Sequence, residues 1–154
     1  MGEVYFYHLT RAPLEVTLRV LLEKSLGAGW RVAVRGRSDA LIGQLDDQLW
    51  LRPEDGFLPH GRAGQDHEAD QPILLTTGAA PNGPDCLVSV EGAAIAPDEV
   101  TAMTRSMVLF DGHDEAALAT AREQWKSLTA AGLAAKYWSE ESGKWQMKAE
   151  SGGG

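Results

Sequence analysis

The chain has 154 residues, of which 44% are hydrophobic and 23% charged, and its formal net charge is −8. This length and composition are typical of one globular domain that buries a core of its own. The negative charge argues against a general nucleic-acid-binding protein, and the absence of any run of about 18 apolar residues argues against a membrane span. We therefore expect a single domain over 1–150 and a disordered Gly-rich tail over 151–154, with little or no direct binding to nucleic acid and none to a membrane.

Apolar strand patterns and helical patterns alternate in the first third of the chain. The run "VYFYHL" at 4–9 predicts a strand, and Leu residues at helical spacing predict a helix over 14–26. "WRVAVRG" at 30–36 predicts a second strand. A second helix is expected over 39–50, with Ser38 as its cap.

The same alternation continues after a polar, acidic connector. The runs "PILLTTG" at 72–78 and "CLVSVEG" at 86–92 predict strands, and a short helix is expected at 97–103. "RSMVLFDG" at 105–112 predicts a further strand. The helix over 113–131 has acidic residues in its first turn. The blocks "LAAKYW" and "KWQMK" then indicate a terminal strand or hairpin.

Strands that are apolar on both faces and alternate with helices indicate an α/β fold. We expect three layers, α/β/α, around a mainly parallel, Rossmann-like sheet. The segment after the first strand, "HLTRAPLE", contains no Gly. A dinucleotide fingerprint and a phosphate-binding loop are therefore both excluded, and no cofactor is expected.

A small enzyme with a site at His8, Asp111 and His113 is the alternative that this fold class leaves open. These residues lie at the ends of two strands whose carboxyl ends would share one edge of the sheet, where His and Asp could act as acid, base or metal ligand. The competing interpretation is that the "DGHD" stretch, which ends at Asp114, caps the following helix. The chain has no G-x-S-x-G motif, and Cys86 lies in an apolar strand where we expect it to be buried.

The stretch "HGRAGQDH" offers His60, Asp66 and His67 as candidate metal ligands. They lie in an acidic loop with no supporting Cys or third His. We therefore expect no metal site.

The stretch "LWLRPEDGFLPHGRAG" at 49–64 is unusually apolar for a segment rich in turn-forming residues. Two prolines predict a stiff loop that fixes the rings of Trp50 and Phe57. These rings could roof the sheet. The interpretation favoured here is that they anchor a protein partner, because rigid aromatic side chains are common anchors at interfaces.

Three residues of the helical stretch "AREQWKSL" lie close together on one side of the helix. Arg122 and Lys126 are separated by four positions, and Trp125 lies next to them. One interpretation is a solvated face with a half-buried Trp. The other is a pocket for an acidic peptide with an apolar tip, in which the cations pair with carboxylates and the indole stacks.

The order of several sequence blocks resembles the chi subunit family of bacterial DNA polymerase III, an accessory protein of the clamp loader. The resemblance covers about residues 4–145. It rests on the blocks "FYHL", "LLEKSLGAGWRVAVRG", "LDDQLWLRPEDGFLPHG", "QPILLTTG", "LFDGHDEAALATAREQWKSLTAAGL" and "YW…GKW".

The resemblance implies a non-enzymatic replisome adaptor that acts in the cytoplasm without a cofactor. It implies a surface for the psi subunit of the polymerase, formed here by Trp50, Pro53, Phe57, Leu58 and Pro59. It also implies that Arg122, Trp125 and Lys126 bind the acidic C-terminal tail of single-stranded DNA-binding protein. One turn before Arg122, where some relatives carry Lys, this chain has Leu118.

Overall fold

The computed structural model describes residues 2–11, 13–50, 59–140 and 144–151, apart from the side chain of Trp50. The strands are β1 (Glu3–Leu9), β2 (Val32–Arg35), β3 (Gly61–Arg62), β4 (Ile73–Thr76), β5 (Cys86–Ser89), β6 (Arg105–Asp111), β7 (Ala134–Ser139) and β8 (Gln146–Ser151). The helices are α1 (Leu14–Gly27), α2 (Asp39–Trp50), α3 (Pro97–Ala102) and α4 (Glu115–Ala130), with a 3-10 turn at Glu68–Asp70.

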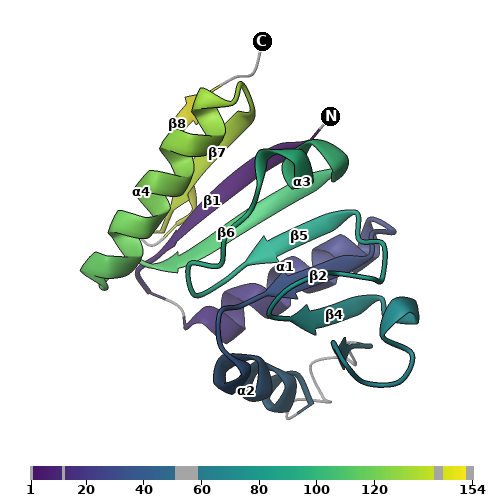
Figure 1. Ribbon diagram of the computed structural model, residues 1–154. Coiled ribbons are helices and arrows are strands. Elements are labelled where there is room, and N and C mark those ends of the chain that lie inside the picture. The colour runs from purple at the N-terminus through teal and green to yellow at the C-terminus, as the bar shows by residue number, and fades with distance from the viewer. Residues whose placement is uncertain (1, 12, 51–58, 141–143, 152–154) are drawn as a thin grey trace.

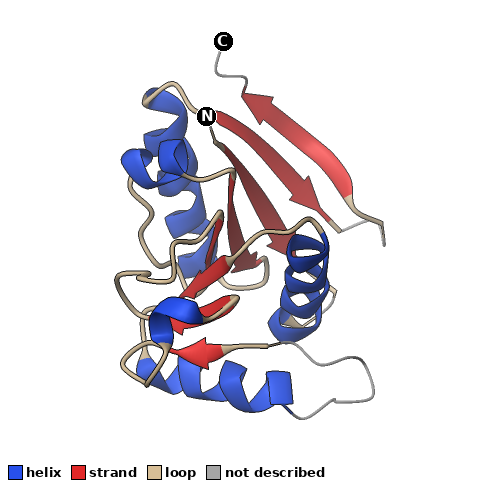
Figure 2. Ribbon diagram, turned by 90° about the vertical axis from the view of Figure 1, so that its right-hand side faces the viewer, coloured by secondary structure: helices blue, strands red, loops and turns tan. Residues whose placement is uncertain are grey.

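The strands form one mixed, mainly parallel sheet in the order β3-β4-β2-β5-β6-β1-β7-β8 (Figure 1). Every neighbouring pair is parallel except β7 and β8, which form an antiparallel hairpin at one edge. Helices α3 and α4 cover one face of the sheet and α1 covers the other (Figures 1 and 2). The three-layer α/β/α fold predicted from the sequence is therefore confirmed.

Two apolar clusters lie on the two sides of the sheet, as a parallel sheet covered on both faces requires. In one cluster, helix residues such as Leu18 of α1 and Leu45 of α2 pack with strand residues such as Val34 of β2. In the other cluster, residues of α3 and α4, such as Leu128, pack with strand residues such as Phe6 of β1. Burial of these side chains stabilises the fold, at roughly 25 cal/mol for each Å² of apolar surface removed from water.

The carboxyl ends of β1 and β6 lie side by side, with Leu9 opposite Asp111. The chain leaves β1 through α1 toward β2, and leaves β6 through α4 toward β7, so the two connections run to opposite faces and opposite edges of the sheet. Open α/β sheets commonly bind their ligands at such a point. This edge of the sheet is therefore a place where a ligand-binding site should be sought.

The observed elements match the sequence-based expectations except over 61–70. The segment over 61–70, the polar, acidic connector in which the sequence predicted no strand or helix, contains β3 and the 3-10 turn. Of the two forms expected for the end of the chain, the hairpin is the one observed, and β8 continues to Ser151. Among the residues described, no helix is both long enough and apolar enough to cross a membrane.

Candidate functional site

Helix α4 begins where the sequence places a cap. The Asp114 carboxylate accepts hydrogen bonds from the backbone N–H groups of Ala116 and Ala117, at 2.9 and 3.3 Å. Asp111 accepts a bond of 2.8 Å from the backbone N–H of His113. The capping interpretation of the "DGHD" stretch is therefore correct, and these short acceptors fix the start of α4.

The outer side of α4 carries two cations beside a half-buried ring. Ala121 and Leu128 are buried against the sheet, whereas Arg122 and Lys126 are exposed. Trp125 lies between these two environments. The exposed cations and the half-buried indole agree with the first interpretation, a solvated face with a half-buried Trp, and the second interpretation, a pocket for an acidic peptide, stays a prediction.

The indole of Trp125 is held edge-on by two rings of the sheet. Its centroid lies 5.3 Å from that of Phe6, with an interplanar angle of 70°, and 6.0 Å from that of Tyr137, with an angle of 79°. Such edge-to-face pairs contribute about 0.5–1.5 kcal/mol beyond the burial of their area. The indole is thus a fixed wall rather than a freely rotating side chain.

A pocket of about 370 Å³ opens beside this ring. Among the described residues, its lining is mostly apolar, with three cations and no carboxylate, from Phe110, Leu118, Ala121, Arg122, Trp125, Lys126, Tyr137, Lys148 and Ala149. All three residues predicted for the acidic tail, Arg122, Trp125 and Lys126, are therefore brought together here. In a chain with a net charge of −8, a pocket that cations and mainly apolar groups line is suited to an anionic ligand with an apolar end.

The sequence analysis missed Phe110 and Tyr137, and it also missed two lining residues near the end of the chain, Lys148 and Ala149. The latter two come from β8, which reaches the pocket because it pairs with β7, where Tyr137 lies opposite Ala149. The hairpin was an open expectation, but its register depends on the pairing of two distant segments. The alternation within "KWQMK" gave no means of deciding which side chains face α4.

The carboxyl edge of the sheet has a larger pocket, of about 620 Å³, which Asp111 and His113 both line. His8 is not part of its lining. The His8 ring instead stacks on Phe110, with centroids 5.3 Å apart and planes 10° apart, and meets the edge of Tyr137 at 5.9 Å. The three residues of the enzyme alternative therefore do not converge in one pocket.

Polar groups along this edge are engaged within the protein. The Nε2 atom of His113 donates to the carbonyl oxygen of Thr10 at 2.7 Å. The Glu91 carboxylate accepts from the backbone N–H groups of Arg37 and Ser38, at 2.7 and 2.8 Å. These contacts support loops and a helix start, which is a structural role.

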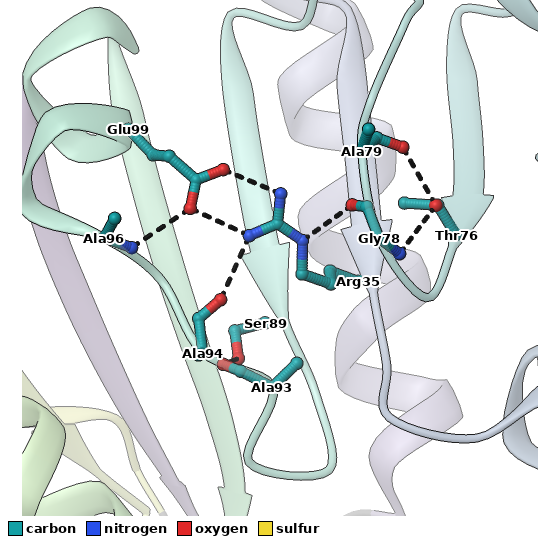
Figure 3. Close-up of polar contacts among 9 residues, drawn as sticks. All are labelled: Arg35, Thr76, Gly78, Ala79, Ser89, Ala93, Ala94, Ala96 and Glu99. Atoms are coloured by element: carbon teal, nitrogen blue, oxygen red, sulfur yellow. Dashed lines mark hydrogen bonds and ion pairs between the residues drawn. The ribbon is translucent and has the colours of Figure 1, made fainter.

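Arg35, at the carboxyl end of β2, is also engaged within the protein, through four hydrogen bonds (Figure 3). Its guanidinium donates to the carbonyl oxygens of Gly78 and Ala94 and to both carboxylate oxygens of Glu99. Burial raises the pKa of the Cys86 thiol to about 12, which keeps it protonated. Neither the cation nor the thiol is therefore poised for chemistry on a substrate.

His60, one of the proposed metal ligands, has a different role. Its side chain is fully buried, and its Nε2 atom lies 2.9 Å from the Asp46 carboxylate of α2. His67 is 80% exposed, and no group of three candidate ligands occurs among the residues described.

Most of the predicted psi-facing surface lies outside the described residues. This applies to Pro53, Phe57 and Leu58, and to the side chain of Trp50, the residue at which α2 ends. Pro59 is half-buried. The prediction for this surface therefore stays a prediction.

Comparison with known proteins gives the family. The family model described as "DNA polymerase III chi subunit, HolC" matches residues 1–136. The chain belongs to this family. It is similar to the DNA polymerase III subunit chi of Escherichia coli, with 28% identity over 108 residues, or 69% of this chain and 71% of that protein. It is also similar to the subunit chi of Pseudomonas aeruginosa, with 33% identity over 94 residues, or 58% of this chain and 65% of that protein.

As a member of the chi family, the chain is a subunit of DNA polymerase III and acts in DNA replication. The family match includes all of α4 and ends within β7. The helical wall of the cationic pocket therefore lies inside the matched region, whereas β8 lies beyond it.

Proposed function

We propose that this protein is a non-catalytic adaptor of the replisome. One surface binds the psi subunit and thereby the clamp loader, and the pocket beside α4 binds the acidic C-terminal tail of single-stranded DNA-binding protein. It works within the cytoplasmic replication machinery and needs no cofactor of its own.

The pocket beside α4 is the observation that carries the tail-binding half of the proposal. An acidic tail offers carboxylates, which suit Arg122 and Lys126, and an apolar end group, which suits the space against Trp125. The bulk charge of −8 repels such a tail at a distance. Attraction must therefore come from close pairing inside the pocket, where every charged side chain among the described lining residues is a cation.

The psi-binding half rests on the sequence block "LWLRPEDGFLPHG" and on family membership. The block begins at Leu49, which is buried in the core, and its last residue but one is His60, which is buried against Asp46. Both ends of the segment are therefore anchored to the body of the domain. Anchored ends reduce the entropy that a partner must overcome on binding.

A catalytic role is not supported at the carboxyl edge, because His8 is stacked in the core and Asp114 caps α4. The named relatives are subunits of a polymerase, and their name assigns no separate reaction to them. An adaptor is therefore the better account of this edge, whose polar groups maintain the fold.

Titration with a short peptide tests the tail-binding half. A labelled peptide with several Asp residues and a free C-terminal Phe should bind with a dissociation constant on the order of micromolar, about −8 kcal/mol. The control peptide has the same length and charge but ends in Ser. We expect at least about tenfold weaker binding of the control, because the apolar pocket then stays unfilled. Equal affinity for the two peptides, or none for either, would contradict the proposal.

Co-expression with psi from the same organism tests the other half. The two chains should co-elute in size-exclusion chromatography as a complex of one copy each. Separate elution at micromolar concentration would remove psi from the proposal and leave the tail site unaffected.

A further inference from the structure

We propose that Lys148, on β8, is a third cation of the tail-binding pocket and pairs with a carboxylate of the bound peptide from the strand side, while Arg122 and Lys126 pair from the helix side. This inference rests on the proposed function. It adds a residue from beyond the family-matched region, which ends at residue 136.

The first argument is an irregularity in the β7–β8 pairing. Tyr137 lies opposite Ala149, but its neighbour Trp138 lies opposite Met147, so β8 contains one residue more than β7 at this point. That residue is Lys148. An extra residue in one strand of an antiparallel pair is a β-bulge, which changes the direction of side chains locally.

The bulge decides which face Lys148 reaches. Trp138 packs near Tyr5, on the face of the sheet away from α4, whereas Tyr137 packs on Trp125, on the face covered by α4. Met147 and Ala149 pair with these two residues and so belong to opposite faces. Strict alternation would place positions 147 and 149 on the same face. The register shift allows Lys148 and Ala149 both to line the pocket on the α4 side.

The second argument is that the three cations of the pocket are not engaged elsewhere. Within the described residues, no ion pair or hydrogen bond is made by the side chains of Arg122, Lys126 or Lys148. The cations that support the fold differ in this respect. Arg35 pairs with Glu99, and Lys136, two positions from Trp138 on the same face, lies 3.8 Å from Glu150. The pocket therefore combines three uncompensated positive charges with an apolar lining.

The third argument concerns the shape that these residues give to the site. Arg122 and Lys126 are one turn apart along α4, so they can follow successive carboxylates along the helix. Lys148 lines the same pocket from β8, so it approaches a bound peptide from the strand side. Carboxylates contacted from two elements are held in position as well as attracted. The small side chain of Ala149 leaves room for the apolar end group next to Lys148.

Substitution of Lys148 in the full-length chain, followed by titration with the Asp-rich peptide ending in Phe, tests this inference. We expect Lys148→Ala to weaken binding about threefold to fivefold and Lys148→Glu about tenfold at low salt, since an exposed pair contributes modestly. Lys148→Arg should retain affinity. Ala149→Leu, which fills the pocket without changing charge, should also weaken binding.

The matched control is Lys24→Glu, at an exposed position near the end of α1, because it changes the net charge by the same amount far from the pocket. Thermal unfolding of each variant checks that β8 remains paired. A loss with Lys148→Glu that exceeds the loss with Lys24→Glu supports the inference.

The remaining outcomes separate this inference from the proposed function. If Lys148→Glu binds like Lys24→Glu while Arg122→Glu loses affinity, then Lys148 is no part of the site, although the helix-side site stands. If Arg122→Glu and Lys148→Glu both bind like the unmodified chain, the pocket is not the tail site and both proposals fail.

Discussion

The guanidinium of Arg35 binds the Glu99 carboxylate through two hydrogen bonds, 2.9 Å from Nη1 to Oε1 and 2.7 Å from Nη2 to Oε2 (Figure 3). The pair joins the end of β2 to the short helix α3, and the same guanidinium reaches the loop after β4 through Gly78. Planar two-point pairs of this kind are stronger and more specific than single contacts. Three segments that are distant in sequence are therefore fixed at one side chain.

Glu99→Gln should lower the free energy of unfolding by roughly 1–2 kcal/mol at neutral pH. The hydrogen bond from Arg35 holds the pKa of Glu99 below its ordinary value of 4.5. A lowered carboxyl pKa contributes stability that is fully present above the ordinary pKa and is lost as pH falls through the pKa of the folded protein. The difference between wild type and Glu99→Gln should therefore shrink below about pH 4.5. Urea unfolding at pH 7, 5 and 3.5 measures it, and a difference independent of pH would contradict this account.

The fold could be predicted because its signals are local and periodic. Leu18 and Leu22 recur at helical spacing and are both buried, and the strand of Ile73 is apolar at its first three positions and buried at all four. By contrast, β3 has only two residues and depends on pairing with β4, so no periodicity could indicate it. Short edge strands of this kind are set by tertiary contacts.

The site could be predicted only in part, for the same reason. The positions of Arg122, Trp125 and Lys126 follow from the geometry of a single helix. Lys148 depends on a bulge, which is a property of two paired strands. His8 was predicted at the sheet edge, yet it shares a face of β1 with Phe6, at a spacing of two residues. The alternation of β1 therefore contained the information that His8 lies under α4.

Trp125 should matter for folding as well as for peptide binding, because its ring packs on Phe6 and Tyr137. We expect Trp125→Ala to reduce the free energy of unfolding by roughly 2–4 kcal/mol, and Trp125→Phe by less than about 1.5 kcal/mol. Urea unfolding measures the change in the free energy of unfolding. Titration with the Phe-terminated peptide, under conditions where each variant is fully folded, measures the change in peptide affinity. A stable Trp125→Ala variant would show that the indole is not part of the core.

Trp50 and Phe57 are predicted to anchor the psi subunit. Trp50→Ala or Phe57→Ala should weaken the complex with psi by about 2 kcal/mol or more, roughly thirtyfold, as loss of an aromatic anchor does. The free domain should lose less stability than the complex. Trp145→Ala is the control, because it removes an exposed indole from elsewhere on the surface. Unfolding of the free chain without a specific loss of psi binding would assign these rings to the core.

Arg122 should dominate the electrostatic attraction of the acidic peptide. Its guanidinium lines the pocket at an exposed position, so its contribution is a close charge-assisted contact that water and salt partly screen. Arg122→Ala removes that contact, and Arg122→Glu replaces it with repulsion, so the second change should cost more affinity than the first.

The screening length falls from roughly 30 Å at 0.01 M salt to about 10 Å at 0.1 M. Affinity of the wild type should therefore fall as salt rises, and the fall should be smaller for Arg122→Ala, which has one charge pair fewer. Calorimetry of the three proteins with the peptide at two salt concentrations measures both effects. Binding that is unchanged by Arg122→Glu, or that is insensitive to salt, would place the tail site elsewhere on the chain.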